Sequence, residues 1–435
     1  MFRTDYTAFT GGRHVPESRR RFVVLFMAFI FTSGCFGDFG SIENQSVDLE
    51  SILLDDYSDC NKKLFTSFNY SIKQPIVDIC LNEHTNLERL LNPYRSIAVG
   101  NGQPDLNDAS MNPEEYGLNI STWQLDNGGW GKVGYQKYMN PWDGVENRSV
   151  YICNHASCEK KELSTFDNNA TTAEMRFLAD LYEQSVSEEN KSVFKNSFEK
   201  GVGFILNSQN ASGGWPQVSP MRYGSGTYSN LGTFNDHVIV RNMLLLLDIV
   251  TDNSLFDDSL VFELNHSAIN QSLLLGIGFI LNTQIIVADE PTIWSQQYDM
   301  NDLSPSGARS FELTGRSTWE SAGVTALLLN WPDRDIAVER AIVGAIKWYE
   351  SNAIWNMTYV YDLPNQEGNG EILAQSDEVM WYRLYNLSDD QFFLSSREGV
   401  KIYDISKLDD ERRFGYQWGG DWGRDILTQV SIRYG

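Results

Sequence analysis

The stretch Gly201-Val-Gly-Phe-Ile-Leu-Asn-Ser-Gln209 returns further along the chain as Gly276-Ile-Gly-Phe-Ile-Leu-Asn-Thr-Gln284. Each copy is typical of an apolar helix that ends in a short polar turn. A Gly-Gly-Trp phrase follows the first copy at 213–215, and another lies upstream at 128–130. Repeats of this length usually stack copies of one supersecondary unit to complete a core. The pattern predicts a ring of antiparallel helix pairs, with loops rich in Trp, Asn and Gln at one end.

Apolar residues also recur at helical spacing in four other segments, namely 173–183, 238–250, 319–329 and 341–349. The tail from Trp381 is richer in aromatic residues, and short strands are predicted at 392–394 and 400–403. We therefore expect a mainly α protein with a small mixed or β part at the C-terminus.

The N-terminus has the pattern of an export signal. Three arginines at 19–21 precede an apolar run at 22–31, which is too short to span a bilayer. Small residues then lead to Cys35, as in a bacterial lipobox, and ordinary signal cleavage is the alternative. We expect residues 1–34 to be a signal peptide, 35–84 a polar tether or cap, and 85–435 the catalytic domain. The protein would be an outer-membrane lipoprotein with lipid on Cys35, periplasmic or secreted, in a bacterium.

Four cysteines remain after Cys35, and an even number in an exported chain suggests disulfides. Nearest-neighbour pairing, Cys60 with Cys80 and Cys153 with Cys158, is the simplest of three connectivities. Zinc is the alternative, but the sequence has no Cys-x-x-Cys motif. The formal net charge of -24 argues against binding nucleic acid through its phosphates. We expect a monomer with no nucleic-acid partner.

The common catalytic signatures, His-Glu-x-x-His, Gly-x-Ser-x-Gly and a phosphate loop, do not occur in the sequence. Acidic and basic residues recur instead where loops meet helices. Asp236 ends the phrase Thr-Phe-Asn-Asp, where a helix N-cap is the simpler reading. Arg309 lies three residues before Glu312, and a salt bridge between them is its simpler reading. Arg383 and Arg397 are flanked by aromatic residues, where surface stacking would explain them.

Together these phrases resemble the family 10 pectate lyases, in order and over roughly residues 86–424. The resemblance rests on phrases that are each weak alone but lie in register: Trp123–Lys132, Phe166–Ala179, Gly213–Gln217, Thr233–Asp236, Trp294–Asp299, Ala308–Leu313, Glu320–Ser321, Trp381–Tyr385, Arg397–Lys401 and Glu411–Trp418.

The resemblance implies an (α/α) toroid and calcium-dependent β-elimination of polygalacturonate (pectate), giving unsaturated oligogalacturonides. Such a reaction removes a weakly acidic proton from C5 of a uronate. Calcium and cationic side chains on the C6 carboxylate would stabilise the enolate-like charge that develops. The family's base is thought to be an arginine, whose free pKa is above about 12. A neighbouring cation and burial would have to lower that pKa.

The resemblance also assigns roles to individual residues. Arg309 would be the base, and Asp236 would face calcium or substrate, since calcium favours oxygen ligands. Arg383 and Arg397 would clamp carboxylates, and Asn127 and Lys132 would line the cleft. Trp130 and Trp215 would offer stacking faces, and Asp299 would be a second calcium ligand.

This chain departs from the family pattern near the expected site. His237 stands where a second Asp or Asn is usual, and Arg316 and Trp319 replace small residues before Glu320. Two other functions therefore stay open. One is a lyase of the same build that acts on another uronan, and the other is a non-catalytic surface protein that binds pectic oligosaccharides.

Overall fold

The computed structural model describes residues 62–63, 77–81, 86–98, 106, 110–134, 137–153, 155, 158, 161–223, 227–251, 255–362 and 366–434. The chain divides into a unit of residues 1–55 and a unit of residues 56–435, and every described residue belongs to the second. The expected signal peptide and Cys35 lie outside the described residues. Among the helices described, none has the length and apolar character needed to cross a membrane.

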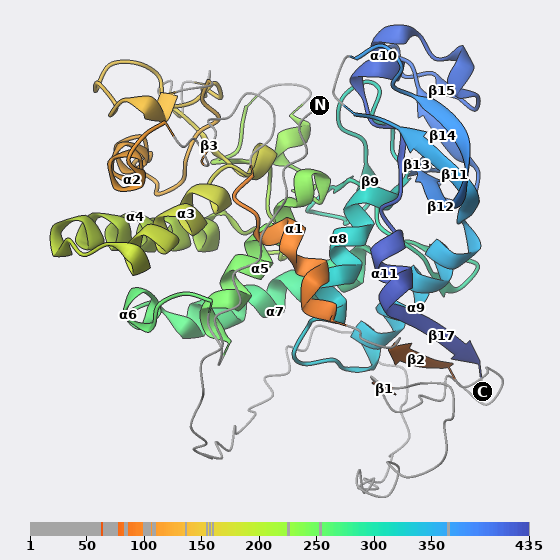
Figure 1. Cartoon of the computed structure of the whole chain (residues 1–435), viewed down its shortest axis with the longest axis horizontal. Coiled ribbons are helices and arrows are strands. Elements are labelled where there is room, and N and C mark those ends of the chain that lie inside the picture. Colours follow the sequence, from red (N-terminus) through yellow and green to blue (C-terminus); the bar gives the residue numbers. More distant parts are fainter. Residues whose placement is uncertain are drawn as a thin grey trace, which may run out of the picture. The chain divides into compact units, whose positions relative to one another are not determined.

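Two layers of helices build the larger part of this unit (Figure 1). The inner helices are α3 (Thr172–Gln184), α5 (Val238–Val250) and α8 (Thr318–Leu329), and the outer ones are α2 (Pro113–Thr122), α4 (Glu188–Ser208), α7 (His266–Thr283) and α9 (Ile336–Ser351). Each inner helix packs against the outer helix that follows it, and neighbours within each layer also touch. Short connections at 185–187 and 330–335 join α3 to α4 and α8 to α9, whereas long loops join α4 to α5 and α7 to α8. This is the (α/α) toroid that the sequence analysis expected.

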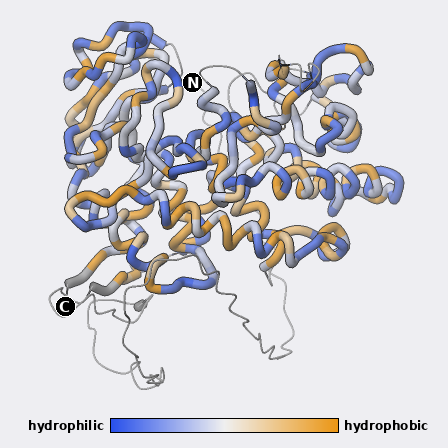
Figure 2. The backbone as a smooth tube through the Cα atoms, turned by 180° about the vertical axis from the view of Figure 1, so that it is seen from behind, coloured by the Kyte–Doolittle hydropathy of each residue, from blue (hydrophilic) through white to orange (hydrophobic). Residues whose placement is uncertain are grey.

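The helices form where their apolar spacing and caps predict. The repeated phrases end α4 and α7, and α5 has the predicted bounds 238–250. Side chains of Asn112, Ser187, Asn265 and Asp335 cap the first turns of the four outer helices by accepting backbone N–H bonds. Hydrophobic residues concentrate along the central helices and give way to hydrophilic ones toward the periphery (Figure 2). The core therefore lies between the two layers.

Three tryptophans repeat one contact around the ring. Each indole N–H donates to a carbonyl of the outer helix that precedes it, at 2.8 to 2.9 Å. All three side chains are completely buried, so their hydrogen bonds form in an apolar surrounding. The pairs are Trp130 with Ile120, Trp215 with Ile205, and Trp294 with Ile280.

The glutamine at the end of each repeated phrase joins one unit to the next. Nε2 of Gln209 donates to the carbonyl of Gly213 in its own loop and to that of Ser272 in α7, both at 2.9 Å. Gly213 has a φ of 96°, and a Cβ there would lie 2.0 Å from the carbonyl oxygen of Leu275. Only glycine fits this turn. Equivalent contacts link Gln124 to Gly128 and Ser197, and Gln284 to Thr292 and Ala341.

A second, smaller core lies under the C-terminal strands. β12 (Glu371–Tyr382) pairs with β11 (Ile354–Val360) and β16 (Gly419–Gly420), while a second sheet has the order β10 (Arg316–Ser317), β13 (Leu384–Tyr385), β14 (Phe392–Ser395), β15 (Lys401–Ile402). The strands predicted at 392–394 and 400–403 are confirmed as β14 and β15. The hairpin of β11 and β12 was not predicted, because much of it is exposed and polar residues interrupt its apolar ones.

Short elements complete the described unit. Its short helices are α1 (Asn92–Arg95), α6 (Asp258–Val261), α10 (Asp410–Gly415) and α11 (Arg424–Gln429), and its short strands are β3 (Ser164–Thr165), β4 (Val218–Ser219), β5 (Gly232–Thr233), β6 (Ile286–Val287), β7 (Glu290–Pro291), β8 (Gln297–Tyr298) and β9 (Pro305–Ser306). From the stretch expected to be a tether or cap, β1 (Lys62–Lys63) and β2 (Val77–Leu81) form a sheet with β17 (Val430–Tyr434).

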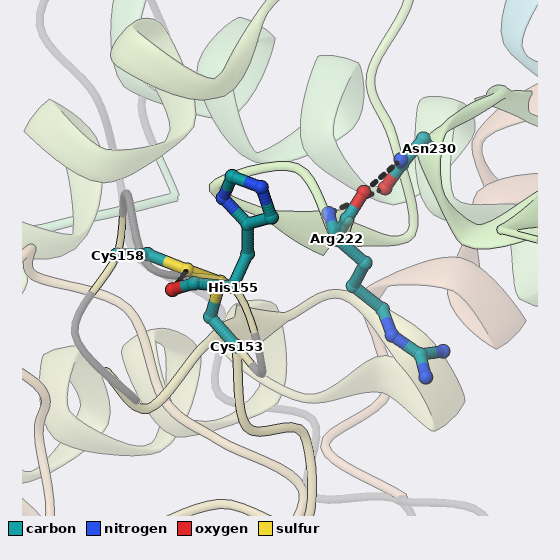
Figure 3. The surroundings of a disulfide bond; sticks show 5 residues. All are labelled: Cys153, His155, Cys158, Arg222 and Asn230. Atoms are coloured by element: carbon teal, nitrogen blue, oxygen red, sulfur yellow. Dashed lines mark hydrogen bonds between the residues drawn. A yellow bond between two sulfur atoms is a disulfide. The ribbon is translucent and has the colours of Figure 1, made fainter. Parts of the chain in front are cut away.

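Cys153 and Cys158 form the predicted disulfide (Figure 3). Cys80 is also disulfide-bonded, whereas Cys60 lies outside the described residues. His155, inside the disulfide loop, stacks on Tyr223 with ring centroids 4.4 Å apart. Tyr223 lies between Val218 and Asn230, and Asn230 exchanges two hydrogen bonds with the backbone of Arg222 (Figure 3). The disulfide loop is thereby held beside a loop that reaches the cavity described next.

Candidate functional site

A polar cavity of about 680 Å³ lies where α3 and α5 begin. We call it the front cavity. Its walls carry acidic, basic, amide and aromatic side chains, which is unusual for a cavity that serves only packing. The lining residues are Ala98, Lys132, Tyr151, Asp167, Asn168, Asn169, Gln217, Tyr228, Asn235, Asp236, His237, Arg241, Arg309, Glu312 and Trp319.

Two equivalent turns supply the carboxylates of the front cavity. Phe166-Asp-Asn-Asn169 precedes α3, and Phe234-Asn-Asp-His237 precedes α5. The third and fourth residues of each turn have positive φ, 53° and 67° in the first and 53° and 58° in the second. Asn and Asp tolerate this left-handed conformation better than most residues. The repeated strained turn thus presents one short acidic side chain from each of two inner helices.

Asp167 is the better satisfied carboxylate of the two. Its Oδ2 accepts from Lys132 Nζ at 2.7 Å and from the Tyr151 hydroxyl at 3.0 Å, while Oδ1 accepts from Gln217 Nε2 at 2.7 Å. Burial alone would raise the pKa of Asp167, but hydrogen bonding to Asp236 and the charge and hydrogen bonds of these partners outweigh it. The pKa of Asp167 is therefore lowered, and this carboxylate stays ionised.

Asp236 lies in the opposite electrostatic situation. Burial, followed by the negative charge of Asp167 and the hydrogen bond to it, raises the pKa of Asp236 to about 8. Two carboxylates this close cannot both ionise readily, so the pair retains a proton at neutral pH. A divalent cation that replaced this proton would relieve the repulsion between Asp167 and Asp236.

The donor set at this pair suits a hard cation. Two carboxylates are accompanied by the amide side chains of Asn168 and Asn235, and calcium prefers such oxygen ligands. Over the described ranges no group of three or more His, Cys, Asp or Glu residues could hold a metal, so a cation there would need further oxygens from substrate or water. His237 is almost completely buried, and its Nδ1 has no hydrogen-bond partner within the described part of the chain.

Asp299, the predicted second calcium ligand, is not among the residues that line the front cavity. It follows β8, and its Oδ1 accepts from the backbone and side-chain nitrogens of Asn301 at 2.7 and 2.9 Å. These contacts are typical of a turn residue. No hydrogen bond or ion pair joins Asp299 to Asp236 in the described part of the chain, and the role of Asp299 as a second calcium ligand stays a prediction.

Arg309 lines the front cavity, and its side chain is 48 % exposed. Its guanidinium forms a two-pronged ion pair with Glu312, in which Nε lies 2.7 Å from Oε2. Burial would lower the pKa of Arg309, but the hydrogen bonds and charge of Glu312 outweigh it and raise that pKa. The salt bridge considered for this pair is confirmed. The expectation that neighbouring groups lower the pKa is wrong for this state, because the nearest charge is an anion.

The two predicted carboxylate clamps are also engaged with acidic side chains of the protein. Arg383 is buried, with Nη2 2.7 Å from Oε1 of Glu320 and its guanidinium stacked 4.4 Å from the ring of Trp319. Arg397 is half-exposed and pairs with Glu411. Neither arginine lines the front cavity, so in this state only Arg309 of the three is directly accessible from it.

The remaining predicted residues divide between the cavity and the core. Lys132 lines the front cavity, whereas Asn127 lies outside its lining and accepts a hydrogen bond of 2.6 Å from the Ser164 hydroxyl. Trp130 and Trp215 offer no stacking faces, and that prediction is wrong. Their rings are completely buried because the indoles join each loop to the helix before it.

Asp167 is the main site residue that the role assignments missed. The phrase Phe-Asp-Asn at 166–168 echoes Phe-Asn-Asp at 234–236, and this echo was the available signal. Tyr151 had no such signal, because the disulfide loop and the fold place it there. No pattern in the sequence indicated that Gln217, Tyr228 and Arg241 would line one cavity.

Comparisons with known proteins agree with this geometry. A family model described as pectic acid lyase matches residues 124–427. A family 10 polysaccharide lyase from Cellvibrio cellulosa is similar in structure, with 27 % identity, a TM-score of 0.62, and coverage of 79 % of this chain and 94 % of that one. A mutant of that organism's family 10 lyase, in complex with trigalacturonic acid, has 26 % identity, a TM-score of 0.63, and coverage of 79 % and 97 %. No curated protein sequence matches significantly.

Proposed function

The chain belongs to the pectic acid lyase family and is a pectate lyase, and from this premise we propose that it cleaves polygalacturonate by calcium-dependent β-elimination, releasing unsaturated oligogalacturonides. One observation carries the proposal. The polar cavity that contains Lys132 and Arg309 also contains the carboxylates of Asp167 and Asp236. These two carboxylates share a proton at neutral pH. The trigalacturonic acid bound to the similar Cellvibrio lyase supports the substrate class.

Calcium, when bound, would supply positive charge that acidifies C5 through the C6 carboxylate of the substrate. Asp167 and Asp236 are the residues that would hold it. Their two carboxylates repel each other when both are ionised, and a bound cation would relieve that repulsion. Asp167 would stay oriented by Lys132, Tyr151 and Gln217 whether or not the cation is present. These hydrogen bonds place the carboxylate before substrate arrives, which reduces reorganisation during the reaction.

Arg309 is the proposed base. It takes the proton from C5, the electrons of that C–H bond form the C4–C5 double bond, and the bond from C4 to the glycosidic oxygen breaks with its pair going to the leaving chain. An arginine side chain can accept a proton only in its neutral guanidine form. Glu312 holds Arg309 in the charged form, so the proposal requires Arg309 to leave Glu312 and lose its proton to solvent before it takes the proton from C5.

The direct test is ultraviolet absorbance over time on polygalacturonate, with calcium or with a chelator. We expect a calcium-dependent rise from the unsaturated product, which Arg309→Ala abolishes and Asp236→Asn reduces by at least about a hundredfold. The matched control is Arg340→Ala in α9, whose guanidinium contacts a backbone carbonyl at the surface. Binding of oligogalacturonates without any absorbance rise would instead establish a non-catalytic binding protein. Activity on a different uronan alone would refute the substrate.

We also propose export of this enzyme with lipid attached to Cys35. The support is the row of arginines at 19–21, the apolar run at 22–31 and the small residues before the cysteine. Growth of an expressing bacterium with labelled palmitate should label the wild-type protein and not a Cys35→Ser variant. Equal labelling of both proteins would contradict lipidation at this residue.

A further inference from the structure

A second cavity, of about 280 Å³, shares part of its wall with the front cavity. We call it the rear cavity. It lies among α1, α5, α8 and the chain around α11, and His237, Arg241 and Trp319 line both cavities. Its volume is near the lower end for small-molecule sites, about 300 Å³, so it suits one sugar residue rather than a chain.

Arg241 is the cation of this shared wall, and the charge of Asp236 acts on it without an ion pair between the two side chains. Its Nη1 donates to the carbonyl of Tyr94 at 3.2 Å and Nη2 to that of Pro93 at 3.4 Å. Nε is buried and has no acceptor among the described residues, and no ion pair of Arg241 occurs there either. Two buried arginines differ in this respect: Arg176 of α3 pairs with Asp248, and Arg383, between β12 and β13, pairs with Glu320.

The Arg241 side chain is partly exposed and its two contacts to carbonyls are long, so the guanidinium keeps hydrogen-bonding capacity that a ligand can use. Anchoring α1 to α5 is the structural role available to Arg241, and it uses the two Nη atoms alone. Because the side chain is partly exposed and forms no ion pair among the described residues, it is available to an anionic ligand in the cavity. A carboxylate would match a guanidinium with two parallel hydrogen bonds.

The other walls of the rear cavity suit a sugar ring. Tyr94, Trp319 and Trp422 supply aromatic surface, and Asp421 and Asp425 are exposed residues of the same lining. Aromatic rings give flat apolar contact area for one face of a pyranose. Exposed carboxylates accept hydrogen bonds from hydroxyl groups. A ring whose carboxylate meets Arg241 would thus direct its hydroxyls toward Asp421 and Asp425.

We propose that the rear cavity is a subsite for one uronate residue of the substrate, and that Arg241 binds the carboxylate of that residue. This inference rests on the proposed function, because it extends the same substrate beyond the front cavity. Trp422 lines only the rear cavity, whereas Arg241 lines both. Substitutions at these two residues can therefore separate the rear subsite from the front one.

The test compares Arg241→Met, Arg241→Lys and Trp422→Ala with the surface control Arg340→Met. The measured quantities are kcat and KM, and the substrates are tri- and tetragalacturonate and highly methyl-esterified pectin. Removing one charge-assisted carboxylate contact should lower kcat/KM on the unesterified oligomers by about tenfold to a hundredfold. We expect this loss in Arg241→Met and a smaller one in Arg241→Lys. Trp422→Ala should raise KM with kcat unchanged, and the loss in the Arg241 variants should be smaller on esterified pectin, which offers fewer carboxylates to the guanidinium.

Several results would overturn the inference. Equal losses on esterified and unesterified substrates, together with a lower thermal unfolding temperature, would assign Arg241 a purely structural role. A loss in Arg241→Met with no effect of Trp422→Ala would place the carboxylate in the front cavity and refute the rear subsite. If the wild-type enzyme cleaves no uronan, the proposed function fails first. Isothermal titration of the wild type and Arg241→Met with trigalacturonate would then still show whether Arg241 binds uronate.

Discussion

Glu174 should contribute to the pH dependence of this protein's stability, and Glu174→Gln should remove that contribution. The side chain lies in the first turn of α3 and is completely buried. Its Oε1 accepts from the Tyr138 hydroxyl at 2.9 Å, while Oε2 has no hydrogen-bond partner in the described part of the chain. Burial therefore raises the pKa of Glu174 from 4.5 to about 7.

The sign follows from linkage. Because the pKa is higher in the folded state than in the unfolded state, the stability that Glu174 contributes is fully present below about pH 4.5. It is lost as the pH rises toward and through about 7. A shift from 4.5 to about 7 corresponds to about 3 kcal/mol when complete, of which about 2.5 kcal/mol is lost between pH 5 and 8.5.

The assay is urea denaturation of wild type, Glu174→Gln and Glu183→Gln at half-unit steps from pH 5 to 8.5. Glu183 is an exposed residue near the end of the same helix, so it controls for loss of one negative charge. The free energy of unfolding of Glu174→Gln, relative to wild type, should rise by about 2.5 kcal/mol across this range. Parallel curves for wild type and Glu174→Gln would refute the reasoning, because Glu174 would then ionise as easily in the folded state as in the unfolded one.

Three other predictions test the ring and its site. Gly213→Ala should destabilise the protein by about 3 kcal/mol in urea denaturation, because its Cβ would strike the carbonyl of Leu275 at a positive φ; Gly203→Ala, in open space within α4, should be neutral or stabilising. Arg383→Met should cost about 3–5 kcal/mol by leaving Glu320 as an unpaired buried charge, and most of the loss should return in the double variant with Glu320→Gln. Chelation should lower the thermal unfolding temperature of the wild type, since calcium at 100 times its Kd would add about 2.7 kcal/mol; an unchanged temperature would contradict calcium binding to the folded state.

Much of the helical architecture could be predicted because its signals are local. The apolar spacing of 238–250 predicts the bounds of α5, and the repeated phrases end α4 and α7 as expected. Even the Arg309–Glu312 pair was foreseeable, since the two residues are three positions apart. The hairpin of β11 and β12 had no such signal, because polar residues interrupt the apolar ones that pack against the core.

The direction in which a side chain points was harder to predict than the element that carries it. Trp130 and Trp215 stand beside glycines in loops, a pattern that suggested sugar stacking. Their indoles instead reach back into the core, since the loop turns over the helix end and an indole N–H needs a buried acceptor. Arg383 likewise meets Glu320 across the ring, a partner 63 positions away that no local pattern indicates.

The sequence by itself determined the stacked helical repeat, the disulfide of Cys153 and Cys158, and the set of acidic and basic residues from which a uronate site can be built. Periodicity and close spacing act within a few residues, so they can be read along the chain. Only the tertiary structure decided that Asp167 and Asp236 interact, that Asp299 is absent from the lining of their cavity, and that Arg241 forms no ion pair among the described residues. Those outcomes depend on contacts between distant segments, whose burial and electrostatics exist only once the ring has assembled.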